Sequence, residues 1–253
     1  MVNELLPWLG SVGLLSVRLL VALALSPPFT GFGVPASVRV ALVFALAALS
    51  LAGQPPAAVA VQLSGDASAL LLPVLAEVLI GAVLGLSVHV VMAALALAGR
   101  LMDVQIGFGI ASVFDPVNRS STNVIGMMTS LIGVVIFMVG GAHWQLANLI
   151  ARSVDVLPIG VMPSLSDPMR PLLAAGSMFS IGLALAAPVA IALLMTDLAI
   201  AVTSRNMPQL NVFVLAVPIK VFVGFLVLMF AVRGWSPLLE RAFEHLAVAI
   251  GVH

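Results

Sequence analysis

Long apolar runs constrain the fold of this chain more than any other feature of its sequence. Of its 253 residues, 62% are hydrophobic, whereas soluble domains are roughly 45 to 50% apolar. A helix of about 20 apolar residues can cross the hydrocarbon core of a bilayer. We therefore predict an all-α integral membrane protein with about six hydrophobic helices, which lie near residues 9–25, 38–52, 69–98, 124–141, 173–201 and 212–232.

Several of these runs differ from regular membrane spans. The second run has only 15 residues, which is marginal for crossing a bilayer, and Pro188 and Pro218 interrupt the last two runs. Residues 141–160, with Trp144 and Arg152, are typical of an amphipathic helix at the membrane interface. Arginines fall equally on both sides of any alternating path, so the positive-inside rule gives no orientation. A regular series of spans and a set of kinked helices buried partly in protein both remain open.

The polar interruption at residues 100–123 stands between two long apolar runs. Gly107 and Gly109 permit backbone angles that other residues resist, and Pro116 disfavours helix at the residue before it. The segment is nevertheless too apolar for an ordinary solvated loop. We predict a non-helical hydrophobic loop held inside a protein assembly. Its four charged residues, in a chain with only 8% charged residues, are Arg100, Asp103, Asp115 and Arg119.

Composition and motifs exclude several classes of function. Ten basic residues balance ten acidic residues, so the sequence has no basic stripe for nucleic acid. It has no cysteine, and it shows no metal-ligand spacing, no P-loop and no nucleophile beside a general base. We therefore expect a protein that is not an enzyme and that needs no cofactor or metal.

Three charged residues lie within the apolar runs, where an ionisable group is costly. They are Glu77, Asp197 and Lys220. One interpretation is a proton or ion relay, as in a secondary transporter. The other is a set of fixed contacts, for example between Asp197 and Lys220 or with a neighbouring subunit. The sequence favours fixed contacts, because no chain of titratable groups connects the three residues.

Two glycines in the third run lie four residues apart. Gly81 and Gly85 therefore share one face of a predicted helix, and small residues with this spacing allow another helix backbone to approach closely. Such spacings also arise by chance in alanine-rich membrane helices. We expect contact with a partner helix at this face.

Two motifs connect these observations to a known family. Residues 205–213 fit R-x-x-P-Q-L-x-x-F, followed by an apolar step and Pro218, and residues 107–116 fit G-x-x-x-A-x-x-x-D-P. Further matches are Pro35 with Arg39, the region 77–85, and GGAHWQL followed by LPIG. In this combination the sequence resembles, nearly end to end, the FliR family of flagellar type III export proteins and their injectisome counterparts.

The resemblance implies an assembly and a location. One copy of a single FliR-like domain, residues 1–253, would join FliP-like and FliQ-like proteins in a closed helical export gate, with an FlhB-like protein at its entrance. The helices would form kinked hairpins surrounded largely by protein, in contact with membrane lipid and with unfolded export substrates. The implied location is the bacterial inner membrane, as a multi-pass protein in the flagellum basal body.

The resemblance also implies roles for particular residues. The loop at residues 106–122 would project into the central channel and help to plug it, because an apolar constriction excludes water and ions by dewetting. The implied plug residues are Ile106, Gly107, Phe108, Gly109, Ile110, Val113, Phe114, Asp115 and Pro116. The implied subunit contacts or structural polar residues are Glu77, Gly81, Gly85, Asp197, Arg205, Pro208, Gln209, Asn211 and Lys220.

Three alternatives stay open at this point. The chain could serve a virulence injectisome in place of a flagellum, although the region of His143 and LPIG favours the flagellar branch. A secondary transporter or small-solute channel would belong to a different class, and it predicts paired halves with broken helices. Gln209 and Asn211 could support a helix break through polar contacts, or they could be surface amides in a simple turn.

Overall fold

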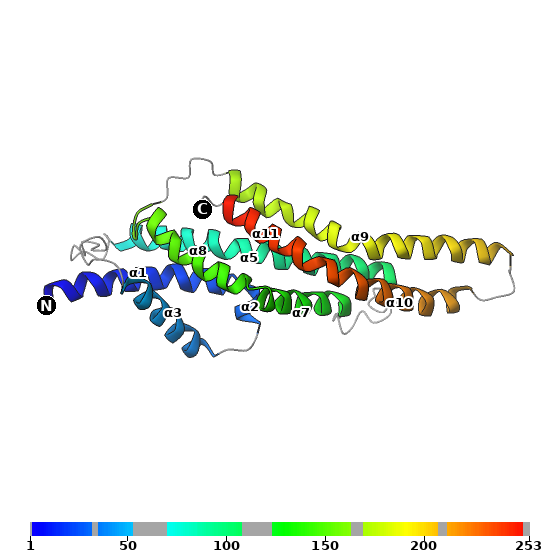
Figure 1. Ribbon diagram of the computed structural model, residues 1–253, viewed down its shortest axis with the longest axis horizontal. Helices are drawn as coiled ribbons and strands as arrows, with labels where there is room; N and C mark the ends of the chain where they lie inside the picture. The colour runs from blue at the N-terminus through cyan, green and yellow to red at the C-terminus, as the bar shows by residue number, and fades with distance from the viewer. Residues whose placement is uncertain are drawn as a thin grey trace. The chain divides into compact units, whose positions relative to one another are not determined.

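The computed structural model describes residues 2–31, 35–52, 70–107, 123–162, 169–206 and 212–249, which are helical apart from short turns (Figure 1). Each of the six apolar runs forms a helix, and no strand occurs within these ranges. Four helices are long and apolar enough to cross a membrane, or five if a bent pair counts as one span. These observations confirm the prediction of an all-α integral membrane protein.

The helices follow one another with short connections. The order is α1 (Val2–Ala24), α2 (Pro27–Thr30), α3 (Ala36–Leu51), α5 (Leu71–Ile106), α7 (Val124–Val139), α8 (Ala142–Val156), α9 (Met169–Asn206), α10 (Val212–Ala231), the 3-10 turn η3 (Val232–Gly234) and α11 (Trp235–Ala249).

The chain forms two compact units, each built from separate stretches of sequence. Unit 1 comprises Met1–Val90, Gly141–Ala175 and Phe243–His253, and unit 2 comprises Val91–Gly140 and Gly176–Ala242. The expectation of a single domain over residues 1–253 stays a prediction.

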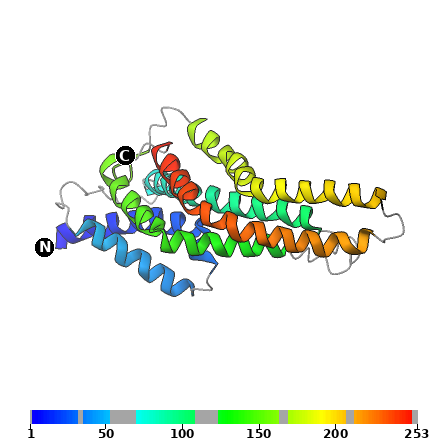
Figure 2. The same cartoon turned by 45° about the vertical axis from the view of Figure 1, so that its right-hand side comes forward.

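Unit 1 contains α1, α3, α8 and the first part of α5. Figure 2 shows α3 beside α1, against which it packs. On α8, Leu146, Ile150 and Val154 are buried while Trp144 and Arg152 are exposed, as expected for the amphipathic helix predicted from the sequence. The fully buried apolar core of this unit includes Leu15, Ala22, Ala47, Leu51, Ala76 and Leu84.

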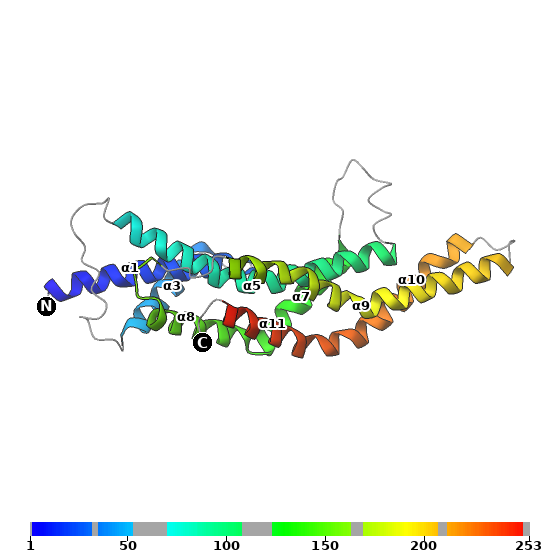
Figure 3. The same ribbon diagram turned by 90° about the horizontal axis from the view of Figure 1, so that it is seen from above.

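Unit 2 contains the end of α5 together with α7, α9, α10 and η3. Figure 3 shows α9 and α10 running side by side in opposite directions, and both helices continue through their internal prolines, Pro188 and Pro218. Its buried core includes Leu95, Met102, Ile125, Phe137, Leu185, Val189 and Leu193.

The helix after the second connector is longer than predicted. α5 extends to Ile106, so Arg100 and Asp103 are helical, and the expectation of a non-helical segment over all of residues 100–123 was wrong for its first seven residues. Continued helix buries Met102 and Ile106. The helix ends at Gly107, whose φ of 102° lies in the left-handed region, where glycine is favoured.

The next helix is broken once. α7 ends at Val139, and α8 starts at Ala142 after Gly141, which has a φ of 76°. Because an L side chain is strained at this angle, glycine permits the break.

Candidate functional site

The first candidate is a buried ion pair in unit 1. Arg18 of α1 and Glu77 of α5 both have fully buried side chains, and the Arg18 Nε donates to Glu77 Oε2 at 2.6 Å. A second hydrogen bond joins Arg18 Nη2 to Glu77 Oε1 at 3.2 Å. Removing two charges from water is costly, and only close geometry with further hydrogen bonds offsets that cost. The two parallel contacts provide that geometry.

Further hydrogen bonds connect this ion pair to α8 and to the turn that follows it. Arg18 Nη1 donates to Ser153 Oγ at 3.0 Å, and Nη2 donates to the Leu157 carbonyl oxygen at 3.1 Å. Glu77 Oε1 accepts from the Gly160 N–H at 2.8 Å. The pair therefore joins α1, α5 and the chain after α8. Both groups are held by fixed partners away from the surface, which suits a structural role better than ion transport.

Gly81 and Gly85 bring α1 and α5 close enough for the ion pair to form. A Cβ atom on Gly81 would meet the carbonyl oxygen of Arg18 itself, and one on Gly85 would lie 2.7 Å from the Ala22 carbonyl oxygen. Contacts this short leave no room for any side chain. The partner of this glycine face is therefore α1 of the same chain.

Sequence analysis assigned no partner to Glu77. Arg18 is the only charged residue of the first apolar run, and it lies 59 residues from Glu77. Two opposite charges in separate apolar runs were the available signal. The roles of Ser153 and Gly160 in the network had no such signal, because a serine and a glycine are common in any turn or helix.

The second candidate is the start of α7 in unit 2, where a side chain from α5 binds its backbone. Asp103 is 5% exposed, and its Oδ1 and Oδ2 accept from the N–H groups of Ile125 at 3.0 Å and Gly126 at 3.1 Å. The Oδ1 atom of Asn123 also accepts from the Gly126 N–H, at 3.2 Å. This places a carboxylate at a helix N-terminus, where negative charge is favourable.

Small residues continue this contact along both helices. A Cβ atom on Gly99 would meet Gly126 and Thr129, and the Thr129 Oγ1 donates to the Leu95 carbonyl oxygen at 3.1 Å. On α7, Gly133 lies directly against the Leu95 side chain. We call this line of close contact between α5 and α7 the α5/α7 seam.

Of the plug residues implied by the family resemblance, the structure describes two. Ile106 is buried and lies against Gly224 of α10, where an added Cβ would be 2.7 Å from its Cδ1. Gly107 ends α5. Phe108, Gly109, Ile110, Val113, Phe114, Asp115 and Pro116 lie outside the described residues.

The third candidate is the face between α9 and α10. Asp197 and Lys220 form an ion pair at 2.5 Å, with side chains 52% and 21% exposed. Of the nearby predicted contact residues, Arg205 is exposed at the end of α9, while Pro208, Gln209 and Asn211 lie outside the described residues.

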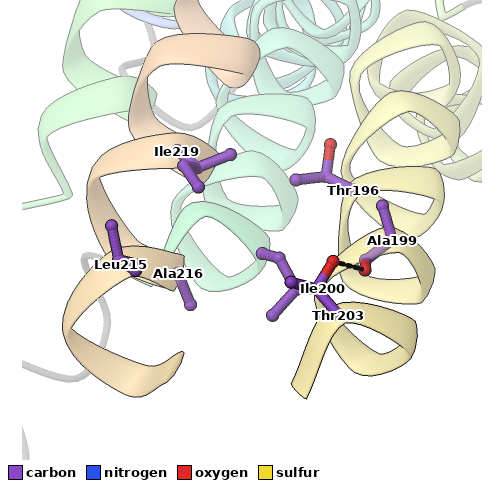
Figure 4. Close-up of a pocket in the computed structure, with 7 residues that line it drawn as sticks. All are labelled: Thr196, Ala199, Ile200, Thr203, Leu215, Ala216 and Ile219. Carbon is purple, nitrogen blue, oxygen red and sulfur yellow. Dashed lines mark hydrogen bonds between the residues drawn. The ribbon is translucent and has the colours of Figure 1, made fainter. Parts of the chain in front are cut away.

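Beside this ion pair is a groove of about 200 Å³. Figure 4 shows Ile219 and Ala216 of α10 facing Thr196 and Ile200 of α9 across it. The hydroxyl groups of Thr196 and Thr203 donate to backbone carbonyls of their own helix, each at 2.8 Å, so the lining is apolar in effect. The seven lining residues are Thr196, Ala199, Ile200, Thr203, Leu215, Ala216 and Ile219.

Replacing Lys220 with methionine should change the free energy of unfolding of the detergent-solubilised protein by no more than about 1 kcal/mol. Its ion pair with Asp197 is partly open to solvent, and solvent screens such pairs strongly. Equilibrium unfolding of the variant beside wild type measures this difference. A loss several times larger would mean that the pair is a principal contact of unit 2.

The described part of the chain offers no metal centre. Within it, no group of three or more His, Cys, Asp or Glu residues is placed to hold an ion.

Comparison with known proteins adds a family match. Residues 9–246 match the family described as bacterial export proteins, family 1. The chain is 31% identical over 233 residues to the flagellar biosynthetic protein FliR of Bacillus subtilis, covering 90% of this chain and 88% of that protein.

Two further relatives align over a shorter stretch. FliR of Pectobacterium carotovorum is 33% identical over 169 residues, which is 66% of this chain and 65% of that protein. The Yop proteins translocation protein T of Yersinia pestis is 32% identical over 167 residues, which is 65% of this chain and 64% of that protein. In these two alignments the chain spans slightly less than two thirds of the relative.

Proposed function

Because this chain belongs to the bacterial export proteins, family 1, which include FliR and translocation protein T, we propose that it is a pore-forming structural subunit of a flagellar type III export gate. The match over residues 9–246 carries the proposal. In this role the chain moves no small solute by itself and catalyses no reaction. It contributes helices to a conduit for unfolded flagellar proteins in the bacterial inner membrane, at the flagellum basal body.

The partners in this proposal are FliP-like and FliQ-like gate subunits and an FlhB-like subunit. The surface of α9 and α10 supports association with other proteins. Only 28% of the apolar stretch of α9 is buried, and only 11% of the stretch that includes α10. This surface carries the half-exposed Asp197 beside Lys220. Charged groups are costly in hydrocarbon, so a protein neighbour suits this face better than lipid does.

The plug in this proposal is the connector at residues 106–122. The α5/α7 seam supports it, because the seam holds both helices from which the connector starts and ends. The connector is also rich in apolar residues. A ring of such residues blocks water and ions by dewetting and needs no charge to do so.

Shortening the connector between residues 108 and 121 should abolish secretion of flagellar proteins while the gate still assembles. Ile106, Gly107 and Asn123 stay in place in this variant, because they belong to the packed ends of α5 and α7. Secretion is measured in the culture medium of a strain that lacks the chromosomal gene, and assembly is measured by co-purification with the FliP-like and FliQ-like subunits.

A full-length connector provides the matched control. In it, serine replaces Phe108, Ile110, Val113 and Phe114, so length is kept and apolar surface is lost. We expect this control to assemble and to let small ions leak across the membrane. Normal secretion by the shortened variant would overturn the plug. Failure to co-purify the wild-type chain with either partner would overturn the gate itself.

An injectisome subunit is a second candidate function. The identity to translocation protein T, 32%, is as high as that to the FliR proteins, 31% and 33%. Complementation separates the two, because a flagellar subunit should restore motility to a strain lacking its own FliR, and an injectisome subunit should not.

A further inference from the structure

We propose that Asp103 is a positioning residue that fixes both ends of the connector between α5 and α7. The residue lies four positions before Gly107, where α5 ends, and its carboxylate binds the first turn of α7. The inference rests on the proposed function only for its effect on export. Its effect on the two helices follows from the contacts alone.

Asp103 binds the two ends through different atoms. Its backbone carbonyl oxygen accepts from the Gly107 N–H at 3.2 Å, in the last turn of α5. Its side-chain oxygens accept from Ile125 and Gly126, at 3.0 and 3.1 Å. One residue therefore holds the place where the chain leaves α5 and the place where it enters α7.

These hydrogen bonds have no easy substitute. The first N–H groups of a helix lack partners within the helix, and Ile125 and Gly126 are buried, away from water that could replace an acceptor. Leaving a buried donor without an acceptor carries its full desolvation cost.

Asn123 cannot take over the role of Asp103. Its side chain accepts from Gly126 but not from Ile125, as is usual for a residue that caps its own helix. In the described part of the chain, Asp103 is the acceptor for the Ile125 N–H. The two side chains therefore differ in a way that an experiment can resolve.

The position of Asp103 along α5 explains why its contact also sets the spacing of the helices. Leu95, Gly99 and Asp103 lie at intervals of four residues, so they share one face of α5. All three contact α7, through Gly133, Thr129 and Gly126 respectively. Asp103 is the last contact of the α5/α7 seam before the connector begins.

Amide hydrogen exchange in the assembled wild-type gate and its variants tests this inference. With Asp103→Ala, exchange of both the Ile125 and Gly126 amides should accelerate at least about tenfold, as expected when a buried donor loses a charged acceptor. With Asn123→Ala, only the Gly126 amide should accelerate. With Asp103→Asn, which keeps the size and one acceptor oxygen, the effect should be intermediate.

Secretion of flagellar proteins provides the second readout. We expect it to fall in Asp103→Ala with assembly unchanged, and to be partly restored in Asp103→Asn. Unchanged exchange at Ile125 in both Asp103 variants would overturn the inference, and so would normal secretion by Asp103→Ala. If Asp103→Ala does not assemble, the comparison between Asp103→Asn and Asn123→Ala decides by the same criterion at Ile125.

Failure of the proposed function would look different. In that case the wild-type gene would not restore secretion to a strain that lacks it, whereas the exchange pattern at Ile125 and Gly126 would still report on Asp103.

Discussion

Replacing Arg18 with alanine should lower the free energy of unfolding by about 3–5 kcal/mol, the range found when one partner of a buried ion pair is removed. The variant leaves Glu77 fully buried, with the Gly160 N–H as its remaining described partner. It also removes the donors that reach Ser153 and Leu157. Equilibrium unfolding in mixed detergent, followed by helical circular dichroism, measures the change.

A double replacement separates the cost of an unpaired charge from the value of the pair. Arg18→Met combined with Glu77→Leu fills the same space without charge, and it should be less destabilising than Arg18→Ala alone, because no buried charge lacks a partner. Arg18→Lys should fall between wild type and Arg18→Ala, since an ammonium group cannot make the two parallel contacts of a guanidinium. Near-equal stability of wild type and Arg18→Ala would show that the pair contributes little.

Replacing Gly81 with alanine should destabilise unit 1 by about 1–3 kcal/mol, the usual cost of forcing extra atoms into a packed site. The new Cβ would meet the Arg18 carbonyl oxygen and lie 3.1 Å from the Val21 Cβ. Backbone atoms cannot turn aside as a long side chain can, so α1 and α5 must separate. Separation would also lengthen the contact between Arg18 and Glu77. The same unfolding experiment measures this effect.

Gly13 provides the matched control within α1. A Cβ atom there would meet nothing within 4 Å, so Gly13→Ala should stabilise the protein by roughly 0.5–1 kcal/mol through helix propensity alone. The two glycine substitutions therefore have opposite expected signs. Destabilisation by Gly13→Ala, or tolerance of Gly81→Ala, would contradict the close approach of α1 and α5.

The sequence predicts the helices of this protein well, because apolar runs and prolines are local signals. The end of α5 was the exception. Charged residues and glycines appeared to stop the helix near Arg100, but Asp103 is helical because it binds residues 22 and 23 positions further along the chain. Tertiary contacts of this kind override local preference, and no local pattern reveals them.

The candidate sites were predictable to different degrees. The contact between Asp197 and Lys220 was one of the alternatives that the sequence offered, because few charges exist in the apolar runs to be paired. The partner of Glu77 could have been found by the same argument applied to Arg18. By contrast, Ser153 and Gly160 enter the network through the fold of the chain, from 135 and 83 residues away.

The break at Gly141 bears on the number of times the chain crosses the bilayer. Without α7 and α8 there are four candidate spans, an even number that leaves both ends of the protein in one compartment. If α7 and α8 together form a span, the total is five, and the ends face opposite compartments. The left-handed backbone of one glycine thus decides whether reporters fused to the two termini light up on the same side of the membrane.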